Sequence, residues 1–179
     1  MKKIFILCIA LIGLFASCKK SSSSGGSSLS ATVGGTNKNF STSAYAAKAS
    51  QGGFYGYGMA GFASVSTEEE IDISITNEPS GDTIIAGTYS DTSSRFNVDL
   101  EYLTSASLAG IDYEGGTDWD GYNSSVGNPV TNHVKLVITS VTATTISGTF
   151  SGNVYVDGDA TTTPFSITSG SFSLPIRQL

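Results

Sequence analysis

The chain has 179 residues, of which 15 are acidic and 9 are basic, and its formal net charge is −6 at pH 7. All of the acidic residues lie within residues 29–179, which carry only five of the lysines and arginines, so this part is about ten charges negative. Because nucleic-acid binding depends on Lys and Arg side chains that neutralise phosphates, the charge balance argues against a nucleic-acid partner.

The N-terminal segment has the features of a bacterial secretion signal. Lys2 and Lys3 follow the first methionine, and an apolar run extends from Ile4 to Phe15. This run is much shorter than the ~20 residues that a membrane-spanning helix needs. It therefore predicts a cleaved signal peptide instead of a membrane span.

The stretch LFASC at residues 14–18 resembles a bacterial lipobox, in which a leucine and small residues precede an obligatory cysteine. By this resemblance we expect cleavage between Ser17 and Cys18, so that residues 1–17 form a lipoprotein signal peptide. The Cys18 thiol then carries a diacylglyceryl group and its amine an acyl chain such as palmitate. Several buried chains anchor a protein stably to a membrane, whereas one chain is marginal. The alternative is an ordinary signal peptide with a chance cysteine.

The cysteine count restricts the chemistry of the mature protein. Cys8 is the only other cysteine of the chain, and it lies in the expected signal peptide. The mature domain is therefore expected to have no disulfide and no thiol-based metal or redox site. Its stability must come from packing and hydrogen bonding.

Composition divides the mature chain into a tether and a domain. Residues 18–28 contain the run KKSSSSGGSS, which has no apolar residue to bury and is typical of a flexible linker. Residues 29–179 have the length of one domain.

Alternation of polar and apolar residues predicts that this domain is all-β. In residues 70–76 the isoleucines occupy every second position, and residues 96–102 and 133–138 repeat the pattern. Strands with one wet face favour an antiparallel β-sandwich or a flattened barrel, here of about eight to ten strands. Residues 54–62 contain three glycines, which predicts either a central strand beneath bulky neighbours or a close approach of a ligand.

The C-terminal third has a recurring strand-and-turn pattern. VKLVIT at 134–139 is followed by ISGTFSG at 146–152 and by ITSGSFSLPI at 167–176. The pattern resembles small, uncharacterised envelope lipoproteins of Gram-negative bacteria. The resemblance implies a β-sandwich-like domain without an assigned activity. We expect the lipid-anchored protein to lie at the outer membrane. In that group acidic residues after the cysteine often accompany surface export, whereas Lys19 and Lys20 stand here, so a periplasmic and a surface position both stay open.

The acid-rich segment at residues 112–123 is the first candidate site, and we expect it to be a loop. Asp118, Asp120 and Asn123 offer hard oxygen ligands of the kind that calcium prefers, and Gly121 allows a sharp turn. The same segment lacks the distal glutamate of an EF-hand. The competing interpretation is a solvated loop whose Asp and Asn side chains bond to their own backbone.

Aromatic residues in the same segment favour a second ligand class. Tyr113, Trp119 and Tyr122 could stack against a sugar while neighbouring carboxylates accept hydrogen bonds from its hydroxyls. The competing interpretation is that Trp119 closes the end of the domain as a packing residue.

Catalysis is not expected. His133 is the only histidine, and the sequence contains no G-x-S-x-G nucleophile motif and no set of zinc ligands. We therefore expect a lipid-anchored, non-catalytic binding module for a glycan, a peptide or calcium. The alternative is a structural domain that packs against another envelope protein.

Overall fold

The computed structural model describes residues 26–51, 54–64, 66, 69–77, 82–105, 110–116, 134–156 and 163–178. These residues form eleven β-strands and no helix, so they contain no helix able to cross a membrane. The predicted all-β class is confirmed. In chain order the strands are β1 (Ser28–Val33), β2 (Thr36–Asn39), β3 (Thr42–Gln51), β4 (Phe54–Phe62), β5 (Glu70–Thr76), β6 (Gly87–Ser90), β7 (Asn97–Leu103), β8 (Asp112–Gly116), β9 (Val134–Val141), β10 (Thr145–Val156) and β11 (Phe165–Gln178).

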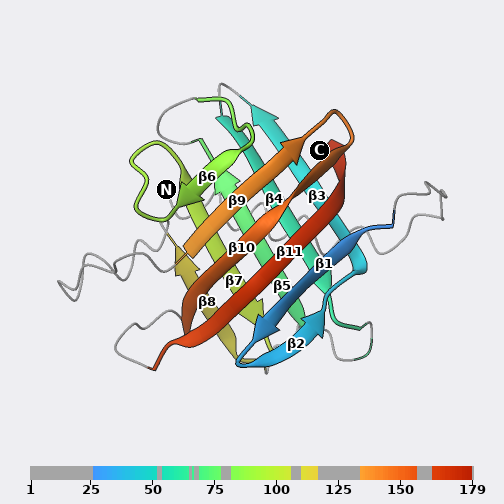
Figure 1. Ribbon diagram of the computed structural model, residues 1–179, viewed down its shortest axis with the longest axis vertical. Helices are drawn as coiled ribbons and strands as arrows, with labels where there is room; N and C mark the ends of the chain where they lie inside the picture. The colour runs from blue at the N-terminus through green and yellow to red at the C-terminus, as the bar shows by residue number, and fades with distance from the viewer. Residues whose placement is uncertain are drawn as a thin grey trace.

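The strands lie in two layers that cross each other (Figure 1). The front layer has the order β2-β1-β11-β10-β9-β6, and the back layer has the order β3-β4-β5-β7-β8. Two strands of the front layer continue into the back layer at their C-terminal ends. Residues 176–178 of β11 pair with β3, and residues 155–156 of β10 pair with β8. Because β10 and β11 are antiparallel, these two junctions lie at opposite ends of the front layer.

Three details differ from the sequence prediction. The strand number is eleven instead of eight to ten, partly because β2 and β6 have only four residues each. The pairing of β11 with β3 is parallel, whereas only antiparallel pairs were expected. Residues 112–116 form strand β8 and not the start of a loop, because they pair with β7 on one side and with β10 on the other.

Pro175 marks the point where β11 leaves one neighbour for another. The last residue of β11 that pairs with β1 is Ser173, and the first that pairs with β3 is Ile176. Proline has no backbone N–H and is tolerated where a strand lacks a neighbour on that side. Pro175 therefore lies in an inner strand, at a gap between the pairing with β1 and the pairing with β3.

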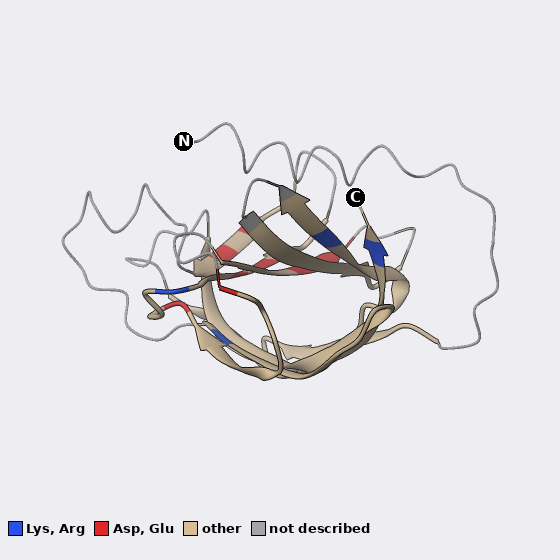
Figure 2. Ribbon diagram, turned by 90° about the horizontal axis from the view of Figure 1, so that it is seen from above, with Lys and Arg blue, Asp and Glu red and all other residues tan. Residues whose placement is uncertain are grey.

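The space between the two layers is filled by the apolar residues that the alternation predicted. Ile71, Ile73 and Ile75 of β5 are fully buried, and Leu136 and Ile138 of β9 are as well. Both layers therefore turn their apolar faces towards each other, and their outer faces carry the polar residues. Figure 2 shows that the acidic residues gather on one of the two layers.

Two glycine–phenylalanine pairs pack against each other across the inner face of β10 and β11. Gly148 lies opposite Phe172, and Phe150 lies opposite Gly170. A Cβ atom on Gly148 would come within 2.7 Å of the Phe172 ring, and one on Gly170 within 2.7 Å of the Phe150 ring. Each ring thus packs over the glycine of the other strand, which explains the repeated G-x-F spacing at 148–150 and 170–172.

The glycines of β4 fit the central-strand interpretation. β4 lies between β3 and β5. Gly61 faces inward, where an added Cβ would collide with the Phe40 carbonyl oxygen, whereas nothing lies within 4 Å of the Cβ position on Gly58. Gly61 is therefore required by packing, and Gly58 is not.

These contacts predict which glycines tolerate a methyl group. Gly148→Ala and Gly170→Ala should each lower the free energy of unfolding by at least about 1–3 kcal/mol, because the added methyl would collide with a backbone carbonyl oxygen, that of Val137 or of Phe150, as well as with a phenylalanine ring. Gly58→Ala is the matched control in the other layer and should change it by less than about 0.5 kcal/mol. Urea unfolding followed by tryptophan fluorescence measures all three. Equal effects at Gly148 and Gly58 would contradict the packing explanation.

Candidate functional site

Three adjacent strands of the back layer carry acidic residues at outward positions. Asp72 of β5 lies opposite Glu101 of β7, and Glu101 lies opposite Glu114 of β8. Three more acidic residues, Glu70, Asp99 and Asp112, occupy outward positions next to this row, and all six side chains are partly buried. We call this group the acidic face: Glu70, Asp72, Asp99, Glu101, Asp112 and Glu114.

The outward positions next to the acidic face are small. Gly56, Gly58 and Ala60 of β4 and Ala47 and Ala49 of β3 alternate with the inward residues of these strands. They place no large side chain beside the carboxylates, and we call these five residues the small-residue floor.

An aromatic–cation pair borders this floor on its far side. The Arg177 guanidinium lies 4.1 Å from the centre of the Tyr45 ring. Tyr45 pairs with Ala60, which in turn pairs with Asp72, so one row of side chains runs from this pair to the carboxylates. Arg177, the cation at the end of this row, thus lies against an aromatic ring.

Crowding and burial shift the acidic face towards its protonated form. Burial raises the pKa of Glu101 to about 9, and the carboxylates of Asp112, Asp72, Glu114 and Glu70 add to the rise. Burial also raises the pKa of Asp72 to about 7, with further contributions from Glu70 and Asp99. The pKa of Glu70 rises to about 7 through burial. Like charges that face each other across strands repel, so the ionised face stores electrostatic repulsion.

Three of these residues are arranged to hold a cation. One carboxylate oxygen each from Glu101, Asp112 and Glu114 lies within 4.8 Å of the other two. A calcium ion binds oxygens at about 2.3–2.6 Å, so oxygens on opposite sides of the ion are separated by nearly this distance. Bidentate binding by some of these carboxylates would supply part of the six to eight oxygens that calcium takes. The donor set therefore fits calcium.

The structure places only part of the sequence-predicted site. Asp118, Trp119, Asp120, Tyr122 and Asn123 lie outside the described residues, as does Cys18. The calcium loop, the Trp119 sugar platform and the lipidation of Cys18 stay predictions.

Tyr113 is described, and it lies on the inner side of β8. Its ring stacks on Phe165 at a centroid distance of 4.7 Å and lies 5.9 Å from the Tyr102 ring. These contacts give Tyr113 a packing role between the layers. They do not present its ring beside the outward residues Asp112 and Glu114.

A polar cluster lies beside these rings. The Tyr102 hydroxyl donates a hydrogen bond to Glu69, which also forms an ion pair with Lys38. Burial, followed by the hydrogen bond to Glu69, holds the pKa of Tyr102 well above its ordinary value of 10. The two charged side chains of this cluster, Lys38 and Glu69, are paired with each other. The cluster therefore connects β2 and β7 to the segment before β5, which is a structural role.

Sequence reasoning missed Glu101 and Asp72 as site residues. The signal was present, because EIDI at 70–73 and VDLE at 98–101 both place acids at the wet positions of a strand. Which strands are neighbours does not follow from either segment alone.

The chain matches no family model, no curated protein and no solved structure.

The raised pKa values predict how stability depends on pH. A carboxyl whose pKa is higher in the folded chain than its ordinary value of 4.5 binds its proton more tightly when folded, so protonation favours folding. This contribution is complete below about pH 4.5 for Glu70 and Glu101 and below about pH 3.8 for Asp72, and it is lost as pH rises through about 7 for Glu70 and Asp72 and about 9 for Glu101. The free energy of unfolding should therefore fall between pH 5 and pH 9, as measured by urea unfolding.

Two variants with opposite expected effects on stability test whether the acidic face causes this decrease of stability with pH. Glu101→Gln should flatten the profile and raise stability at pH 8, because it removes a charge from the crowded row. Glu69→Gln should lower stability at pH 8, because Lys38 loses its counter-charge. A wild-type profile that rises with pH would show that the acidic face does not control stability.

Proposed function

We propose that the protein is a lipid-anchored domain of the bacterial cell envelope that binds calcium and has a non-catalytic role. The observation that carries the calcium assignment is the convergence of Glu101, Asp112 and Glu114 on one point of the outer face of the back layer. A divalent cation there replaces repulsion between carboxylates with attraction, so the ion and the folded domain stabilise each other.

The anchor is supported by the sequence. The lipobox-like LFASC precedes Cys18, and a serine- and glycine-rich tether follows it. Such a tether lets the domain turn relative to the membrane. The negative charge of the domain disfavours contact with anionic headgroups, which suits a ligand-binding face directed away from the lipid.

A structural role is the alternative function, and a different observation favours it. Ala47, Ala49 and Gly58 of the small-residue floor are partly exposed and carry at most a methyl group, so another protein surface could approach the backbone of β3 and β4 closely there. On this alternative the domain packs against another envelope component, and the acids border the contact.

The anchor predicts a change of phase when Cys18 is replaced. Cys18→Ser should move the protein from the detergent phase to the aqueous phase in a temperature-induced phase separation, and should abolish labelling by palmitate. Cys8→Ser is the matched control and should leave both unchanged, because Cys8 leaves with the signal peptide. Labelling of the Cys18→Ser protein would overturn the lipid assignment.

Calcium should raise the thermal unfolding midpoint. At about a hundred times the dissociation constant a ligand of the native state adds ~2.7 kcal/mol. For a chain of this size that raises the midpoint by roughly 5–10 °C relative to chelator. The measurement uses the full chain in detergent, and Glu101→Gln should remove the shift. Asp82→Asn, at the Arg95 ion pair off the acidic face, is the control and should keep it.

A further variant separates the strand site from the predicted loop site. If Asp118→Ala with Asp120→Ala removes the shift and Glu101→Gln does not, calcium binds the loop and the strand site is wrong. If the wild type shows no shift, the calcium proposal fails and the structural alternative becomes the better explanation.

A further inference from the structure

The front layer has an outer face of a different chemical character. Its outward residues form rows across the strands, in which Ser30 lies opposite Ser171, and Ser171 lies opposite Thr149. A second row pairs Ser173 with Ser147. We call this surface of β1, β11, β10 and β9 the hydroxyl face.

The hydroxyls of this face are held in place by one another. The Ser30 and Ser171 oxygens lie 3.2 Å apart, and Ser147 donates a hydrogen bond to Ser173 at 3.0 Å. A serine hydroxyl has one donor and two acceptor positions, so each member of such a pair keeps hydrogen-bonding capacity towards solvent. The face therefore presents ordered donors and acceptors at regular spacing.

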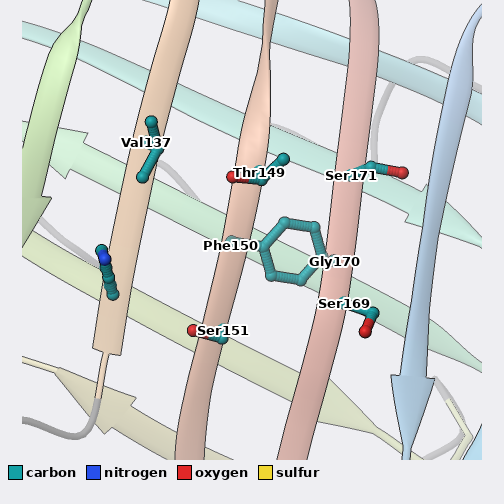
Figure 3. Close-up of a pocket in the computed structure, with 8 residues that line it drawn as sticks. Val137, Thr149, Phe150, Ser151, Ser169, Gly170 and Ser171 are labelled. Carbon is teal, nitrogen blue, oxygen red and sulfur yellow. The ribbon is translucent and has the colours of Figure 1, made fainter.

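A shallow depression interrupts the hydroxyl face between β9 and β11. Figure 3 shows Thr149 and Ser151 on β10 between Val137 on β9 and Ser169 and Ser171 on β11. The lining also includes Lys135, which lies opposite Ser151, together with Phe150 and Gly170.

A β-bulge shapes this depression. Phe150 pairs with Gly170 and Gly152 with Ile167, so Thr168 and Ser169 together face the single residue Ser151. Ser169 has a φ of 52°, a left-handed conformation that is uncommon for a residue with a side chain. Bulges redirect side chains and often lie next to binding sites, and such backbone strain is frequent at functional positions. Two residues of the bulge, Ser151 and Ser169, thus line the depression.

The chemistry of the lining restricts the ligand. Hydroxyls that both donate and accept, and the methyl groups of Val137 and Thr149, match the O–H groups and C–H faces of a sugar. Lys135 is the only charged side chain of the lining, and its positive charge repels a polycation. The negative charge of the whole domain opposes a polyanion. An uncharged, polyhydroxylated ligand remains.

We propose that this depression on the hydroxyl face binds a neutral saccharide, at a site made of different residues from the acidic face. A shallow site with a few hydrogen bonds binds one sugar weakly, because each such bond contributes modestly in water. A polysaccharide offers many copies of the sugar, so its retention of the protein is stronger than that of a monosaccharide.

Affinity electrophoresis in native gels tests the proposal. The full chain in a polyoxyethylene detergent, which carries no sugar, is run through gels that contain dextran, laminarin or galactomannan. At least one of these neutral polysaccharides should retard the protein. Thr149→Val with Ser151→Ala should weaken the retardation about tenfold, because two hydroxyl hydrogen bonds are lost.

Two controls make the result specific. Thr32→Val with Ser28→Ala makes the same changes on β1, outside the depression, and should leave the retardation unchanged. Glu101→Gln should also leave it unchanged, which separates this site from the calcium proposal. No retardation in any of the three gels overturns the proposal. An equal loss in both hydroxyl double variants, or a loss in Glu101→Gln, overturns it as well.

Discussion

The pairing of β10 with β11 is the contact on which the rest of the structure depends. These two strands are the longest, and each continues from the front layer into the back layer, where it meets β8 or β3. Their register is fixed by Gly148 beneath Phe172 and Gly170 beneath Phe150, because a one-residue slip of either strand would turn the phenylalanine of that strand to the outer face. A domain expected to lack disulfides thus gains its closure from one well-specified strand pair.

Closure by two shared strands places the apolar core between the two layers, and the outward residues of each layer take little part in it. The inner faces are fully used by the apolar core, so differences between the two layers are confined to their outer residues. On the back layer these residues are carboxylates beside the small-residue floor, and on the front layer they are hydroxyls. One core therefore supports two surfaces of contrasting chemistry, which can change independently of the packing beneath them.

The sequence predicted correctly those features that depend on one strand alone, such as which of its side chains face inward. The alternation in residues 70–76 and in the segment around Val98 and Leu100 correctly assigned inward and outward residues, because the side chains of a strand alternate with period two. It did not predict that β8 joins β7, since DYEGG at 112–116 has glycines typical of a loop and becomes a strand only by pairing on both sides. The outward acids were thus visible in the sequence, and their convergence was not.

The acidic face combines a cost to stability with a capacity for binding. Glu101 lies between Asp72 and Glu114 on neighbouring strands, where ionised carboxylates repel and a neutral residue would be more stable. Protons relieve this repulsion at low pH, and a divalent cation can relieve it at neutral pH, so proton and cation compete for the same oxygens. A cation that replaces the Glu101 proton would therefore bind more weakly as pH falls, because the carboxylate must lose its proton before it can act as a ligand.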